Sequence, residues 1–151
     1  MSRFAEVVVL ALFAGEVMEP LTREDSTRSW RGRFVPIHSQ WGGSFAHGWA
    51  TEFERVGPRT GLLAHLESLP WPFPKSVQVL IHDEWDDCFG LWMIHDGRLV
   101  EIELPRTQRF HEPAPADLKY PPPPGCLLRT DTNRQLPRQT PPELRDARPA
   151  W

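Results

Sequence analysis

The stretch SVQVLIHDEWDDCFGLWMIHDGRLVEIEL, residues 76–104, decides the fold. It holds three apolar runs, at residues 77–81, 89–94 and 99–104, and two polar turns separate them. Each run has the length of a strand and is rich in β-branched and aromatic side chains. The second turn is Asp96-Gly97, a strong hairpin signal because a type I′ turn needs positive φ at both central residues. We therefore expect three antiparallel strands here.

The two turns predict how these strands pair. A two-residue turn at Asp96-Gly97 predicts the pairs Ile94 with Leu99, Met93 with Val100 and Trp92 with Glu101. A turn at Asp86-Asp87 predicts the pairs Val79 with Ile94 and Ile81 with Trp92.

Alternation of side chains then divides the three strands into two faces. The first face is wholly apolar and holds Leu80, Phe89, Leu91, Met93, Val100, Ile102 and Leu104. The second face holds Val77, Val79, Ile81, Trp92, Ile94 and Leu99, with Glu101 and Glu103 at one end. We expect the first face to pack on the main core, and the second to be partly covered and partly in water.

The residues before this stretch predict three more strands and a helix. Residues 4–13 are apolar apart from Glu6, which is typical of a central strand, and Pro36 makes residues 33–38 an edge or bulged strand. Glycines at 42, 43 and 48 favour a strand over a helix for residues 44–55. Leucines at helical spacing predict a helix of about ten residues within 57–69, ended by the prolines of 70–74. We read residues 15–30 as a loop.

The fold class that follows is α+β, an antiparallel sheet of about five to six strands with one short helix packed on one face. Eleven of the 17 prolines follow Leu104. We therefore expect a single α+β domain at 1–105 and a Pro-rich, partly disordered tail at 106–151. Residues 120–124 favour polyproline II, and the apolar patch 125–129 could dock back on the domain.

Charge is divided unevenly along the chain. Residues 1–104 carry 15 acids and 9 bases, a net charge of −6, whereas residues 105–151 carry 5 acids and 8 bases, a net charge of +3. The acidic part makes nucleic acid an unfavourable partner and favours a protein partner with a basic surface. The candidate contact residues on the acidic hairpin are Asp83, Glu84, Trp85, Asp86 and Asp87.

An aromatic stripe gives a second candidate site. Trp41, Phe45, Trp49 and Phe53 recur every four residues, with His47 among them. Such a stripe is usually core, but an exposed one can stack on a flat ligand. Trp49 and His47 are its candidate binding residues. The pocket would lie between the stripe and the predicted helix, with His47 and His65 at its border.

Chemical motifs are few. The sequence has no HExxH, no CxxC, no glycine-rich phosphate loop and no GxSxG, so we assign no cofactor and no catalytic residue. His82 and His95, each followed by an aspartate, come closest to a metal pair, but the predicted register places them at opposite ends of their strands.

The sequence thus favours a non-catalytic protein-binding module that acts through an acidic hairpin surface. A small, acidic α+β domain with a Pro-rich tail and no catalytic motif is of the general type of a bacterial immunity, antitoxin-like or regulatory protein. A small enzyme or small-molecule-binding protein, with its pocket at the aromatic stripe, is the alternative. The apolar run 7–14 is too short to span a membrane, and we expect a cytoplasmic protein with reduced thiols at Cys88 and Cys126.

Overall fold

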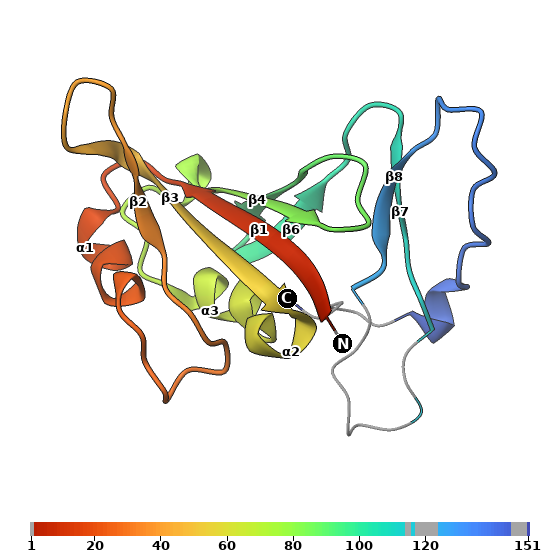
Figure 1. Cartoon of the computed structure of the whole chain (residues 1–151), viewed down its shortest axis with the longest axis horizontal. Coiled ribbons are helices and arrows are strands. Elements are labelled where there is room, and N and C mark those ends of the chain that lie inside the picture. Colours follow the sequence, from red (N-terminus) through yellow and green to blue (C-terminus); the bar gives the residue numbers. More distant parts are fainter. Residues whose placement is uncertain (1, 114–115, 117–123, 146–150) are drawn as a thin grey trace.

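A six-stranded antiparallel sheet, in the order β2-β3-β1-β4-β5-β6, forms the body of the computed structural model (Figure 1). The structure describes residues 2–113, 116, 124–145 and 151. The sheet strands are β1 (Ser2–Leu10), β2 (Val35–His38), β3 (Ser44–Arg55), β4 (Gln78–Asp83), β5 (Gly90–His95) and β6 (Arg98–Ile102). The helices are α1 (Gly15–Met18), α2 (Val56–Arg59) and α3 (Leu62–Ser68), with the 3₁₀ helices η1 (Glu19–Thr22), η2 (Pro74–Ser76) and η3 (Pro142–Leu144). A second sheet pairs β7 (Thr107–Phe110) with β8 (Cys126–Arg129).

The predicted class, α+β with an antiparallel sheet, is confirmed. β1 is central, β2 is a bulged edge strand at Pro36, and residues 44–55 are a strand, as predicted. No helix of the described residues is long and apolar enough to cross a membrane.

The β5–β6 hairpin follows its sequence signal. Asp96 and Gly97 have φ values of 48° and 75°, as a type I′ turn requires. The predicted pairs are all present: Ile94 with Leu99, Met93 with Val100 and Trp92 with Glu101.

The predicted β4–β5 register is wrong by two residues. Val79 pairs with Trp92 and Ile81 with Gly90. Asp86 closes a turn with Asp83 instead of forming a tight hairpin with Asp87: the Asp86 N–H donates to the Asp83 carbonyl (2.8 Å), and the Asp83 N–H donates to the Asp86 carboxylate (2.9 Å). The connection therefore takes up residues 84–89, which shifts β5 along β4.

The assignment of the core face is also wrong. The second face is the buried one: Val77, Val79 and Ile81 are fully buried, whereas Val100 and Ile102 of the first face are 44% and 37% exposed. The reason lies in β1, whose Val7 and Val9 sit beside Ile81 and Val79 and are fully buried. We call the side of the sheet opposite this core the outer face.

The helices cover the core face (Figure 1). The single helix predicted for 57–69 is two helices, because Gly61 has φ +85° and interrupts them, but its leucines at 62, 63 and 66 are buried as expected. The predicted loop 15–30 contains α1 and η1 and ends at Trp30, which is fully buried. The Trp30 indole N–H donates to His65 Nδ1 at 2.7 Å.

The described part of 106–151 is tied to the domain. Patch 125–129 docks back as β8, whose Leu127 N–H donates to the Asp86 carboxylate (2.7 Å). In turn the Asp87 N–H donates to the Leu127 carbonyl (2.8 Å), and Arg109 of β7 pairs with Glu101 of β6 (2.7 Å). The expected polyproline segment lies outside the described residues, apart from Pro124.

Matched valine substitutions test which face is the core. Val79→Thr buries a hydroxyl, so we expect the free energy of unfolding to fall by about 1–3 kcal/mol. Val100→Thr makes the same change on the outer face, so we expect a change within about 0.5 kcal/mol. Urea unfolding followed by tryptophan fluorescence measures both. Equal losses would contradict the assignment of faces.

A pH dependence of stability follows from His65. Burial, followed by the charge of Arg28, lowers the pKa of His65 from its ordinary 6.5. The folded chain therefore binds this proton less readily than the unfolded chain, so the stabilisation is complete above pH 6.5 and is lost as the pH falls below it.

We expect the free energy of unfolding to decline between pH 7.5 and 5, and His65→Gln to flatten this decline. Histidine 95 has a 79% exposed side chain, so His95→Gln is the control and should leave the slope unchanged. Urea melts across this pH range give the slopes, and a His65→Gln slope equal to that of the wild type would refute the assignment.

Candidate functional site

The outer face carries a continuous line of apolar side chains, one from each strand. Register pairs join neighbours across the whole sheet, and we call this line the apolar row: Val35, Ala50, Val8, Leu80, Leu91 and Ile102. At a strand spacing of about 4.8 Å, the row crosses about 24 Å of sheet.

A second line runs parallel to the apolar row, two residues along each strand. Its members are Gly48, Leu10, Gln78, Met93 and Val100. Gly48 leaves no gap, because a Cβ at this position would lie 2.7 Å from the Phe45 side chain and 3.0 Å from that of Ile37. These two side chains close over the glycine and continue the apolar surface.

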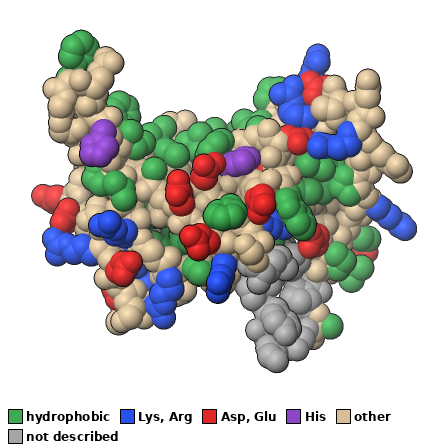
Figure 2. Space-filling view, in the orientation of Figure 1, with side chains coloured by type: hydrophobic (Ala, Val, Ile, Leu, Met, Phe, Trp, Pro, Cys, Tyr) green, Lys and Arg blue, Asp and Glu red, His purple; other side chains and the backbone are tan. Residues whose placement is uncertain are grey.

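These side chains remain in contact with water. Val35 is 46% exposed at one end of the apolar row and Ile102 is 37% exposed at the other, and the four between them are half-buried. Figure 2 shows hydrophobic side chains gathered along the hollow between the two raised ends of the molecule, with acidic side chains beside them. Contiguous exposed apolar patches often mark interaction sites.

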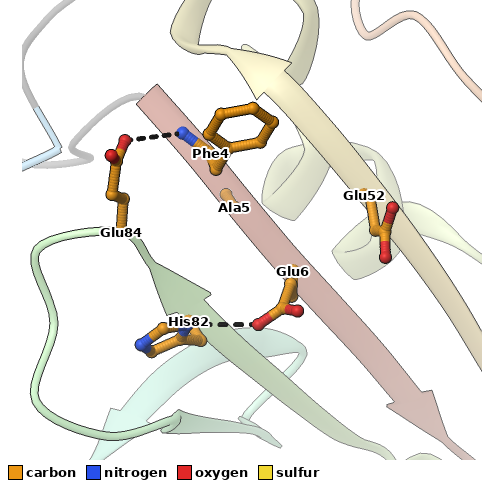
Figure 3. A pocket seen from close by; sticks show the side chains of 6 residues that line it. All are labelled: Phe4, Ala5, Glu6, Glu52, His82 and Glu84. Carbon is orange, nitrogen blue, oxygen red and sulfur yellow. Dashed lines mark hydrogen bonds and ion pairs between the residues drawn. The ribbon is translucent and has the colours of Figure 1, made fainter. Parts of the chain in front are cut away.

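An acidic cavity borders the apolar row. Glu52, Glu6 and His82 pair across β3, β1 and β4, and with Phe4, Ala5 and Glu84 they line a cavity of about 360 Å³ (Figure 3). None of these lining residues is a lysine or an arginine, so the cavity has a negative potential that attracts cations.

Hydrogen bonds hold two walls of the cavity. The Glu84 carboxylate accepts from the Phe4 N–H at 3.1 Å. His82 places Nδ1 3.2 Å from the Glu6 carboxylate and Nε2 3.1 Å from the Asp86 carbonyl, and its ring stacks on Phe89 at 5.0 Å. Both ring nitrogens of His82 thus face oxygen atoms.

Both edges of the sheet carry features that oppose pairing with an added strand. Pro36 and a register irregularity interrupt the β2 edge. On the β6 edge, the Leu99 N–H already donates to the Glu67 carboxylate at 2.8 Å. Both features hinder the addition of another strand.

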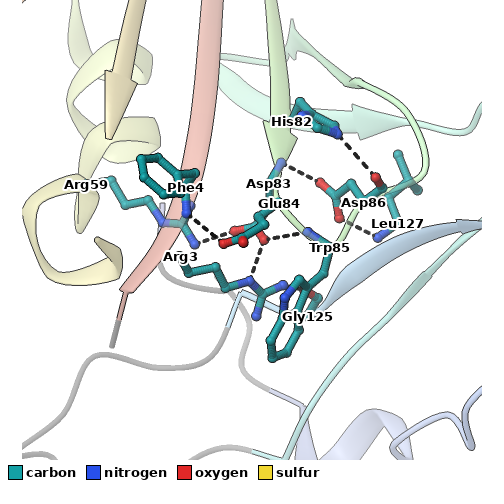
Figure 4. A network of polar contacts seen from close by, with 10 residues as sticks. All are labelled: Arg3, Phe4, Arg59, His82, Asp83, Glu84, Trp85, Asp86, Gly125 and Leu127. Atoms are coloured by element: carbon teal, nitrogen blue, oxygen red, sulfur yellow. Dashed lines mark hydrogen bonds and ion pairs between the residues drawn. The ribbon is translucent and has the colours of Figure 1, made fainter. Parts of the chain in front are cut away.

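Asp83 lies in a buried ionic network rather than on the surface (Figure 4). Its carboxylate accepts from Arg3 Nε and Arg59 Nη2, and all three residues are at most 1% exposed. Arg3 also donates to the Gly125 carbonyl. Burial lowers the pKa of Arg59, and the Asp83 charge opposes that shift.

Tryptophan rings sandwich this network. The Arg3 guanidinium lies 4.1 Å from the centre of the Trp85 ring, and the Arg59 guanidinium lies 4.1 Å from that of Trp151. Contacts at this distance stabilise the cation and shield it from water.

The other two hairpin aspartates serve the attachment of β8. Asp86 is 7% exposed, and burial raises the pKa of its carboxyl. Asp87 accepts from the Arg129 N–H (2.7 Å) and from Arg134, and the hydrogen bond from Arg134 lowers its pKa. Within the part of the chain that the structure describes, Glu84 and Trp85 of the acidic hairpin form no ion pair, and both are exposed.

The aromatic stripe is divided between core and surface. Trp49 and Phe53 are buried, whereas Phe45 is 51% exposed. His47 is half-buried, and its Nδ1 accepts from the Phe13 N–H at 3.2 Å. Neither Trp49 nor His47 lines any of the three cavities described for this part of the chain.

His82 and His95 lie at opposite ends of the β4–β5 pair, as expected. His82 faces Glu6, and His95 pairs with Asp96 at 3.4 Å. Among the described residues, no group of three or more potential ligands could hold a metal ion.

Sequence reasoning did not identify Phe4, Glu6 and Glu52 as site residues. They come from strands that are far apart in the chain and meet only through the register of β1 with β3 and β4. One signal was present: Glu6 is the one charged residue within the run 4–13 that predicted this strand.

Comparisons with known proteins add no relationship. We compared the chain with protein-family models, with curated proteins and with solved structures, and none of them matches. A function must therefore be argued from the geometry of this chain.

The ionic network generates a stability prediction. Asp83→Asn leaves two buried guanidinium groups without a counter-charge, so we expect the free energy of unfolding to fall by about 3–5 kcal/mol in urea melts. Asp96→Asn is the matched control, because its side chain is 92% exposed and asparagine also suits a type I′ turn. The control should change stability by less than about 0.5 kcal/mol. Equal effects of the two substitutions would contradict the role of Asp83.

Proposed function

We propose that this chain is a non-catalytic protein-binding module whose contact surface is the outer face of the six-stranded sheet. The observation that carries the proposal is the apolar row, which crosses all six strands without a covering layer among the described residues. Covering this row removes apolar surface from water, which is favourable by about 25 cal/mol per Å².

The acidic cavity supports a preference among partners. Glu6, Glu52 and Glu84 would repel an acidic surface at this position and attract a basic one. The sequence suggested the same partner chemistry, but it placed the contact on the acidic hairpin. Asp83, Asp86 and Asp87 serve folding contacts, and the Trp85 ring stacks on Arg3. We therefore place the contact on the sheet face, to which Glu84 contributes.

The biological form of this binding remains a proposal drawn from the sequence. An immunity or antitoxin-like protein, or a regulatory one, acts by covering a surface of its partner. A broad contact face with acidic side chains at its border suits such a role against a basic partner.

Affinity capture with matched variants tests the proposal. Val100→Lys/Ile102→Lys places two charges at exposed positions of the outer face, and Leu144→Lys changes a 56% exposed leucine of η3 that lies elsewhere. Immobilised wild-type chain and Leu144→Lys should retain the same protein from a lysate of the native host. The double variant should retain at least about tenfold less, because a buried unpaired charge is costly at an interface.

Circular dichroism and urea melts establish that the three proteins are equally folded. Equal retention by the wild type and the double variant, or no specific retention by the wild type, would refute the proposal.

A further inference from the structure

We propose that the outer face receives one amphipathic α-helix of the partner protein. The helix axis follows the apolar row across the strands, and lysine or arginine side chains on one flank face the acidic cavity. This inference rests on the proposed function and states what kind of partner segment the face takes.

The shape of the outer face favours a helix whose axis crosses the strands. The β2–β3 hairpin rises at one end of the strands and the β7–β8 pair at the other, so a trough runs between them in the direction of the apolar row (Figures 1 and 2). The row is about 24 Å long, which is the length of a helix of about 16 residues. The apolar row and its parallel line lie about 7 Å apart, which fits the apolar stripe of one helix.

Hydrogen bonding favours a helix over an extended segment. The backbone groups of the four inner strands are already paired within the sheet, so an occupant meets side chains alone. An extended segment laid on this face would lose water from its own N–H and C=O groups without gaining partners. A helix satisfies these groups internally. Addition of a strand at an edge is hindered at Pro36 and at Leu99.

Charge complementarity fixes the flank and the half of the helix that carries basic residues. Glu52, Glu6 and His82 lie on β3, β1 and β4, beside one half of the apolar row. Phe4 is 56% exposed at the same place, and its ring face can stack with a guanidinium or ammonium group. The other half of the row, on β5 and β6, continues in apolar side chains, Leu91 and Ile102. The occupant therefore has basic residues in one half and along one flank only.

A second copy of this chain is a poor source of such a helix. The longest helix among the described residues is α3, which has seven residues and packs its leucines into the core. No helix of the described residues reaches about 16 residues, so we assign the occupant to a different protein.

Designed peptides test the inference directly. The basic peptide is a helix-forming chain of about 16 residues with a leucine stripe and arginines along one flank of one half. The acidic peptide has glutamate in place of those arginines, and a third peptide keeps the arginines but has serine in place of the leucines. Each is labelled with fluorescein and titrated with the full chain at physiological salt while anisotropy is recorded.

We expect the basic peptide to bind and to gain helical circular dichroism, and the acidic and serine peptides to bind at least about tenfold more weakly. Glu6→Lys/Glu52→Lys should reverse the preference, so that the acidic peptide binds better than the basic one. The matched control is Glu16→Lys/Glu143→Lys, which makes the same charge change at exposed acids of α1 and η3. It should keep the preference of the wild type.

Several outcomes would overturn the inference. They are no binding of the basic peptide, equal binding of the basic and acidic peptides, binding that does not need the leucine stripe, or a preference that Glu6→Lys/Glu52→Lys leaves unchanged. Dimerisation that Val100→Lys/Ile102→Lys abolishes would also overturn it, by assigning the face to a second copy.

If a captured protein depends on Val100 and Ile102 while no peptide binds, this inference fails and the proposed function stands. If capture does not depend on these residues, the proposed function itself fails.

Discussion

The buried carboxylate of Asp83, held between the guanidinium groups of Arg3 and Arg59, is the interaction on which the rest of the structure depends. A buried charge without partners is strongly destabilising, so these three residues must all lie on the core side of the sheet. Side chains alternate along a strand. Once Arg3 and Asp83 point inward, Phe4, Glu6 and His82 must point outward. The network thus helps to decide which residues form the outer face.

The same constraint explains why an apolar surface stays in water. The alternate residues of β1 and β4 include Val8 and Leu80, which share the outer face with Glu6 and His82. Apolar residues stabilise these strands through cross-strand pairs even where no second layer covers them. A charged substitution on this face would not disturb the core, so stability alone does not account for the uninterrupted apolar row. Under the proposed function a partner covers the row and supplies the second layer that the fold lacks.

The acidic residues of the chain serve two separate purposes. Asp83, Asp86 and Asp87 are joined to arginines and backbone N–H groups and attach α2 and β8 to the sheet. Glu6, Glu52 and Glu84 line an open cavity instead. In the sequence these two groups are alike in charge, and Asp83 and Glu84 are neighbours. Hydrogen-bond partners separate them, since aspartate carries its carboxylate close to the backbone and suits turns and local contacts.

Local structure could be predicted from the sequence. Apolar runs identify β1 and the β4–β6 stretch, glycines favour a strand at β3, Asp96-Gly97 specifies one hairpin register, and leucine spacing marks the helical residues 62–66. The face that became the core, the shift of β5 along β4, and the docking of β7 and β8 on the domain depend on contacts between distant segments. The physical reason is that side chains alternate along a strand with a period of two residues. This alternation defines two faces but does not determine which face is buried. That choice depends on Val7, Val9 and Arg3, which are far away in the chain and meet β4 only after folding.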